Sequence, residues 1–212
     1  MAGRGRPRAF DRTTALRRAM AVFWTRGYAG ASMTDLTGAM GINSPSLYAA
    51  FGSKEQLFRE AVTYYDEVES AAAAEALHAG PTARDAIAEV FRINVEAYTD
   101  PDKPRGCMIV LAATAEADYS EGLRSHVAEL RRSTERGFRE RIERGINDGD
   151  VPAGTDAAAL AAFYHTVLQG MSLEARDGAS RAALAAVAES ALAAWDVLTV
   201  RRPAAPAAAT PQ

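Results

Sequence analysis

The sequence has few of the residue types that build cross-linked, metal-binding or catalytic sites. Its 212 residues include one cysteine, Cys107, and three histidines. A single cysteine excludes an internal disulfide framework. His78, His126 and His165 are scattered and lack metal-ligand spacing. Glycine-rich phosphate loops, nucleophile–histidine patterns and paired carboxylates are also missing, so we predict a protein that is not an enzyme and binds no cofactor or metal.

Long hydrophobic runs are missing as well. No apolar run approaches the about 20 residues of a membrane-spanning helix. The basic stretch 1–8 is not followed by the apolar segment of a secretory signal. Apolar residues still make up 48% of the chain, which is typical of a globular protein. We therefore expect a cytoplasmic protein with no membrane partner.

Strand patterns are rare, whereas apolar residues at three- and four-residue steps occur almost throughout the chain. We predict an all-α fold of about nine helices, with ends set by capping residues, glycines and prolines. The expected segments, caps included, run from Asp11 to Gly27, Thr34 to Met40, Ser44 to Phe51, Lys54 to Ala76, Thr82 to Tyr98, Cys107 to Ala117, Ser120 to Asn147, Thr155 to Gly178 and Ser180 to Leu198.

A net positive charge is found only at the front of the chain. Residues 1–59 hold nine Lys/Arg against three Asp/Glu, a net charge of +6. The remaining residues hold fifteen Lys/Arg against twenty-four Asp/Glu, a net charge of −9. A basic front on an acidic body indicates that only the front meets a polyanion.

Two short predicted helices within this basic front meet at the turn 41–43. The side chains of Leu36, Met40, Ile42 and Leu47 are spaced to share one small core. This pattern is typical of a helix-turn-helix, whose second helix enters the major groove of DNA. Periodicity alone favours an ordinary helical hairpin, but the basic flanks favour the helix-turn-helix.

A denser set of residues surrounds this motif. It comprises Gly27, Tyr28, the run 32–36 (Ser-Met-Thr-Asp-Leu), Met40 to Ile42, Ser46 to Tyr48, and Phe51 to Phe58. Over about residues 10–60 the sequence resembles the DNA-binding domain of the TetR family. The resemblance implies a transcriptional regulator, by family expectation a repressor, that a small-molecule inducer releases from its double-stranded operator DNA. The alternative is a helical small-molecule-binding or protein-interaction module that does not bind DNA.

The resemblance also implies a division of the chain. We expect a flexible basic arm (1–9), a helix-turn-helix domain (10–54), a ligand-binding and dimerisation domain (55–200) and, from its Pro/Ala composition, a disordered tail (201–212). A homodimer would form through the last two helices. Their apolar seams are Leu160, Tyr164, Val167 and Leu168 in one helix, and Leu184, Val187, Ala191, Trp195 and Leu198 in the other.

The expected DNA contacts fall into three groups. Thr34, as the cap of its helix, Tyr48 and Lys54 are positioned for phosphates, although Tyr48 could instead pack in the core on Leu57. At the exposed start of the recognition helix, Pro45 and Ala49 could contact thymine methyl groups, and Ser44 and Ser46 could reach phosphates or base edges. The sequence departs from the common family pattern in lacking a basic residue at Ser44 and an aromatic residue or histidine at Ala49 and Ala50.

An arm of arginines precedes the helices. The run 3–7 (Gly-Arg-Gly-Arg-Pro) resembles the core of an AT-hook, which would place Arg4 and Arg6 in an A·T-rich minor groove. The alternative is a generic basic tail.

Large inward residues of the second domain are candidates for a pocket that holds a small apolar or aromatic ligand. They are Tyr65, Phe91, Tyr98, Cys107, Met108, Leu111, Phe138, Phe163 and Met171, with His165 and Gln169 as polar members. Cys107 has two readings. It follows Arg105 and opens a helix, which would favour a reactive thiolate, or it is a buried apolar residue like most free cysteines.

Overall fold

The computed structural model describes residues 10–113 and 119–199. Within these ranges the chain is all-α, with eleven helices and no strand, so the predicted fold class is confirmed. The helices are α1 (Arg12–Gly30), α2 (Met33–Met40), α3 (Ser44–Phe51), α4 (Lys54–Glu69), α5 (Ala71–Ala79), α6 (Ala83–Tyr98), α7 (Met108–Ala112), α8 (Glu121–Asp148), α9 (Ala157–Arg176), α10 (Arg181–Ala193) and α11 (Trp195–Thr199).

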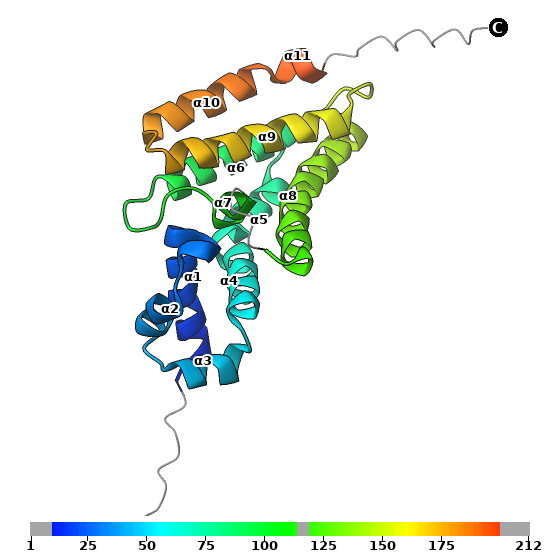
Figure 1. The fold of residues 1–212 in the computed structure, drawn as a ribbon. Helices are drawn as coiled ribbons and strands as arrows, with labels where there is room; N and C mark the ends of the chain where they lie inside the picture. The colour runs from blue at the N-terminus through cyan, green and yellow to red at the C-terminus, as the bar shows by residue number, and fades with distance from the viewer. Residues whose placement is uncertain (1–9, 114–118, 200–212) are drawn as a thin grey trace, which may run out of the picture.

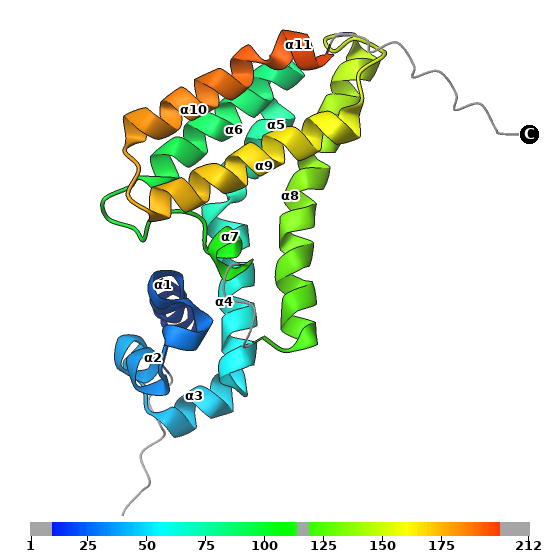
Figure 2. The same cartoon turned by 45° about the horizontal axis from the view of Figure 1, so that its top comes forward.

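The helices form a small head and a larger body (Figure 1). The head consists of α1, α2 and α3, and α4 runs from the end of α3 into the body. The long helix α8 lies along the flank of α4, and α10 and α11 lie at the end of the body far from the head (Figure 2). The C-terminal end of α9 reaches α1, where Arg176 bonds the carbonyl oxygen of Thr25. A change in the direction of α4 would therefore move the head relative to the body.

The two extra helices arise from breaks that periodicity does not mark. The segment expected to run from Lys54 to Ala76 is interrupted at Ser70, which separates α4 from α5. The last helix is likewise interrupted at Ala194, between α10 and α11. Neither position carries a glycine or proline, and the alanine-rich sequence on one side of each break favours a continuous helix. The α7 helix ends at Ala112, and residues 114–118 lie outside the described ranges.

The N-cap residue of α2, in the head, differs from the one that we expected. Ser32, not Thr34, is the N-cap: its Oγ accepts a hydrogen bond from the backbone N–H of Asp35 at 3.1 Å. The Asp35 carboxylate in turn accepts from the backbone N–H of Ser32 at 3.1 Å, which completes a capping box. Thr34 lies exposed within the first turn.

Two other caps are displaced by one residue. Asn43 caps α3 by accepting from the backbone N–H of Ser46 at 2.9 Å, so Ser44 is the first helical residue rather than the cap. Asp156, not Thr155, caps α9. In all three cases another residue that can cap a helix lies within two positions of the expected one.

A continuous apolar core runs through the head and on into the body. Leu36, Met40 and Leu47 are buried, as predicted for a shared helix-turn-helix core, and Ile42 is partly buried against it. The turn between the two helices needs Gly41, whose φ of 70° lies in the left-handed region. The motif therefore has a preformed shape that presents the start of α3 outward.

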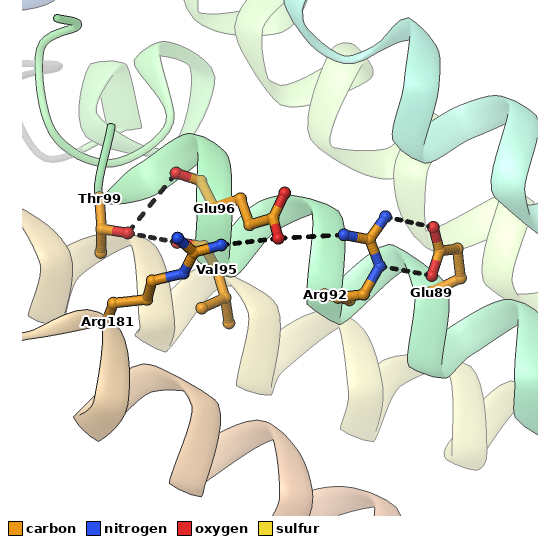
Figure 3. Close-up of polar contacts among 6 residues, drawn as sticks. All are labelled: Glu89, Arg92, Val95, Glu96, Thr99 and Arg181. Carbon is orange, nitrogen blue, oxygen red and sulfur yellow. Dashed lines mark hydrogen bonds and ion pairs between the residues drawn. The ribbon is translucent and has the colours of Figure 1, made fainter. Parts of the chain in front are cut away.

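A chain of ion pairs ties the start of α10 to α6 (Figure 3). Glu89 accepts two hydrogen bonds from Arg92, and Glu96 lies between Arg92 and Arg181, at 3.1 and 2.6 Å. These groups are about half exposed, so each pair contributes at most about 1 kcal/mol. Their main effect is to fix the register of the two helices.

Candidate DNA-binding surface and ligand pocket

The outer surface of α3 carries small and uncharged side chains. Ser44, Pro45 and Ala49 are exposed, and Ser46 is partly buried. Tyr48 is 49% exposed, so it is not the core tyrosine of the alternative reading. This surface offers hydroxyl groups and apolar contacts to a duplex, and no long cationic side chain.

A cationic side chain lies beside the end of α3 instead. Lys54 begins α4, and its Nζ lies 4.6 Å from the centroid of the Tyr28 ring. A cation above an aromatic face is held without losing its charge, so the ammonium stays close to the end of α3. The N-terminal residues Arg4 and Arg6 lie outside the described ranges.

Arg12 serves the packing of the head. Its guanidinium lies 4.3 Å from the centroid of the Phe51 ring, bonds the Glu60 carboxylate at 2.6 Å and reaches the carbonyl oxygen of Ala50 at 3.3 Å. These contacts join the start of α1 to α3 and α4.

The body contains a cavity of about 410 Å³ between α4, α5, α6, α8 and α9. Its volume falls in the range of small-molecule sites, about 300–1,000 Å³. Six of the eleven predicted ligand residues line it: Tyr65, Tyr98, Cys107, Phe138, His165 and Gln169.

The other five predicted ligand residues do not line this cavity. Phe91 borders a surface groove between α6 and α10, and Met108 and Leu111 border a smaller cavity beside α1. Phe163 is partly exposed on α9, and Met171 is buried in the core. Periodicity identified these side chains as inward-facing or apolar, but it does not say which of several spaces they border.

The comparisons with known proteins agree over both halves of the chain. A family profile described as "Bacterial regulatory proteins, tetR family" matches residues 15–61, and one described as "Tetracyclin repressor-like, C-terminal domain" matches residues 81–191. The transcriptional repressor ComR of Escherichia coli (strain K12) is 34% identical over 200 residues, covering 92% of this chain and 93% of ComR. The chain belongs to the TetR family. It is therefore a DNA-binding transcriptional regulator, as the helix-turn-helix residues predicted.

Two further relatives are similar over most of their length. The repressor BdcR of Escherichia coli (strain K12) is 31% identical over 188 residues, covering 88% of this chain and 90% of BdcR. A solved structure of the TetR-family regulator CifR, a cysteine mutant complexed with 26-base-pair operator DNA, is 52% identical. It superposes with a TM-score of 0.86 and covers 90% of this chain and 100% of that chain.

Cys107 of this TetR-family regulator is buried, which favours the second of its two readings, a buried apolar residue, over the thiolate. Burial raises the pKa of the thiol, although contacts with the backbone of α7 and with Tyr65 oppose that shift. The hydroxyl groups of Tyr65 and Tyr98 both interact with the sulfur, and burial raises their pKa values well above the ordinary value. The cysteine therefore stands in the pocket wall as a protonated thiol beside two phenols.

The polar side of the pocket is formed by α8 and α9. Gln169 hydrogen-bonds the His165 ring at 2.9 Å, and Glu135 lies 3.6 Å from the same ring. Burial lowers the pKa of His165, and this outweighs the opposing effect of Glu135. At neutral pH the imidazole is therefore an uncharged hydrogen-bonding group.

Sequence reasoning missed most of the pocket wall, and two of the missed residues bear on function. Trp24 comes from α1 in the head, and its indole N–H donates to the carbonyl oxygen of Gly106 at 3.1 Å. Its ring meets Tyr65 edge-on, with centroids 4.8 Å apart. Asp66, on α4, is the second. Trp24 reads as a core residue of the head, and its reach into the body depends on tertiary packing that no local pattern contains.

The predicted dimer seams are mostly inside one protomer. Leu160, Tyr164, Leu168, Leu184, Ala191 and Trp195 are all buried within the single chain. Val187 and Leu198 are exposed, and Val167 is partly buried. The seams were wrong because an alanine-rich helix has two apolar faces, and the larger side chains face the protomer's own core. The exposed apolar residues nearby are Phe163, Leu173, Val187, Val197 and Leu198.

Proposed function

We propose that this chain is a homodimeric repressor that leaves its operator when a small molecule fills the pocket. The observation that carries the proposal is the composition of the pocket wall. Trp24 belongs to the DNA-binding head, Tyr65 belongs to α4, and both border the cavity. An occupant would thus touch the head and its connecting helix at once. ComR and BdcR are repressors, which supports the direction of regulation.

Several hydrogen bonds join the head and α4 to segments near the pocket. Besides the bond from Trp24 to Gly106, Arg176 at the end of α9 donates to the carbonyl oxygen of Thr25 at 2.6 Å. The hydroxyl of Ser120 donates to the Glu55 carboxylate on α4 at 2.6 Å. A ligand weakens DNA binding only if it binds better to a head position that does not fit the operator. The two contacts of α1 are where such a difference would arise.

A second copy of the chain would cover the exposed face of α9 and α10. Residues Arg181–Thr199 form a helical stretch that is as long and apolar as a membrane span, and 28% of its most apolar window is buried. Phe163 of α9 and Val187 of α10 are large apolar side chains that are also exposed. Burying that face between two copies gives a two-fold dimer. Its two α3 helices would then meet successive major grooves, about 34–36 Å apart.

The operator contacts we propose are those on the head surface. Thr34, Tyr48 and Lys54 would hold phosphates, while Ser44, Pro45, Ser46 and Ala49 would meet base edges. Arg4 and Arg6 would add contacts in the minor groove. A protein with this function works where the DNA is, in the cytoplasm, and it needs no catalytic chemistry.

Two experiments together test the proposal: selection of a DNA duplex from a random pool, and titration of the protein with that duplex. The full chain would select duplexes from a random pool, and fluorescence anisotropy would measure its affinity for the selected duplex at several salt concentrations. We expect affinity to fall steeply with salt, and a metabolite that raises the melting temperature to release the duplex. If no duplex is selected, the alternative of a ligand or protein-binding module is favoured. A metabolite consumed during the assay would indicate an enzyme instead.

A further inference from the structure

The pocket wall contains a partly buried carboxylate that has no cationic partner in the described chain. Asp66 lies on α4 and borders the cavity, and no hydrogen bond or ion pair joins it to another residue of the described ranges. The other carboxylates of the wall are Glu69, which bonds Lys103 at 2.7 Å, and Glu140, which is exposed to solvent. Arg136 of the wall bonds Glu129 at 2.8 Å.

An unpaired negative charge on the Asp66 carboxylate destabilises the protein when no ligand is bound. Burial raises the pKa of Asp66, and the negative charge of Glu67 raises it further. A cation bound beside Asp66 would stabilise its charged form. The carboxylate is therefore a group whose partner is missing from the protein itself.

Aromatic rings form the wall around it. Trp24, Tyr65, Tyr98 and Phe138 all border the cavity and are buried. The planes of Trp24 and Tyr65 stand at 80° to each other, with their ring centroids 4.8 Å apart. The indole N–H is already bonded to Gly106, and both tyrosine hydroxyls interact with Cys107. Ring surfaces rather than donors are what these side chains have left to offer a ligand.

A carboxylate among aromatic rings is the combination that recognises an organic ammonium group. We infer that the effector of this regulator is a small organic cation with an apolar body, whose ammonium group lies at Asp66 and against the rings. This inference rests on the proposed function, because it assigns a ligand class to the same pocket. The cavity of about 410 Å³ admits such a molecule. An anion would instead seek Arg131, which borders the pocket on α8.

Three probes of similar shape separate the ligand classes. They are phenyltrimethylammonium (cationic), tert-butylbenzene (neutral) and benzenesulfonate (anionic). Isothermal titration of the full-length protein without DNA should show the cation binding at least about tenfold more tightly than the neutral probe, a preference of about 1.4 kcal/mol. Undetectable binding of the cation, or equal or tighter binding of either other probe, would overturn the inference.

Two matched variants locate the charge. Asp66→Asn keeps the shape and should weaken the cation about tenfold while changing the neutral probe by less than about twofold. Glu67→Gln removes the adjacent acid of α4, which is exposed and does not border this cavity, and should leave the cation within about twofold. Equal losses in both variants, or none in Asp66→Asn, would contradict the assignment. The comparison of probes on the wild-type protein does not depend on either variant folding.

The effect of each probe on binding of a selected duplex is measured separately. If the cation binds as expected but leaves a selected duplex bound, the ligand class stands and the proposed regulation fails. If the neutral probe binds more tightly and releases the duplex, the regulation stands and the ligand class is wrong.

Discussion

Lys54 allows the DNA-binding surface to be tested with a nearly ideal internal control. The chain has only two lysines, Lys54 in the head and Lys103 in the body. In Lys54→Met the fold loses the cation–aromatic contact with Tyr28, which at this partly buried position is worth about 0.5–2 kcal/mol. For a chain of this size, each loss of about 1 kcal/mol lowers the melting temperature by about 2–4 °C. The protein should therefore remain folded and dimeric.

The loss on DNA should be larger. A charged hydrogen bond to a phosphate contributes about 1.5–3 kcal/mol, so affinity should fall at least about tenfold. In a plot of log affinity against log salt, the slope should become shallower by about one unit per protomer. Anisotropy titrations of a selected duplex between 50 and 200 mM salt would measure both quantities.

The control removes the same charge elsewhere. Lys103 is paired with Glu69 in the body, so Lys103→Met should leave the slope unchanged. If Lys54→Met keeps the wild-type slope and affinity, Lys54 does not contact phosphate. If both variants lose the same slope, the effect reflects net charge rather than the head surface.

Three other perturbations follow from the same contacts. Val187→Arg changes an exposed apolar position of α10 and should give folded monomers in sedimentation. Trp195→Arg should instead unfold the protein, because Trp195 is buried within the protomer. An intact Val187→Arg dimer would contradict the interface. Cys107, whose pKa burial raises, should react slowly with an alkylating reagent at pH 7 and faster as the pH rises; fast labelling at pH 7 would show that the thiol is activated. Burial also lowers the pKa of His126, which lies 3.0 Å from the hydroxyl of Thr63, so the unfolded chain takes up this proton more readily. Its contribution to the unfolding free energy should be complete above the ordinary pKa of about 6.5 and fall below it, and urea titrations of His126→Gln between pH 5 and 8 should show a weaker pH dependence.

The head could be predicted from sequence because its determinants are local. The turn glycine Gly41, the cap residues and the spacing of Leu36, Met40 and Leu47 all act within about twenty residues. Even the errors in the caps were displacements of one or two residues. A local pattern of this kind is close to a complete description of a helix-turn-helix.

The body could be predicted only in outline because its determinants are long-range. Periodicity shows that α9 and α10 have apolar faces, but it does not say which face meets the protomer and which meets a partner. The ring centroids of Tyr164 and Trp195 lie 5.7 Å apart inside the protomer. The pocket combines Trp24 and Asp66 from two separate helices, and no sequence window contains both together with the α8 and α9 residues opposite them.

Linkage between the pocket and the operator is the property on which the proposed regulation depends. It is measured as the affinity for a selected operator duplex while the concentration of a pocket-binding compound is raised to saturation. A suitable compound raises the melting temperature of the wild-type protein and no longer binds when Ala73→Trp obstructs the pocket. We expect the operator affinity to fall and then reach a plateau, and the operator to weaken compound binding by the same factor. An operator affinity that stays constant while the pocket is saturated would contradict the proposed regulation.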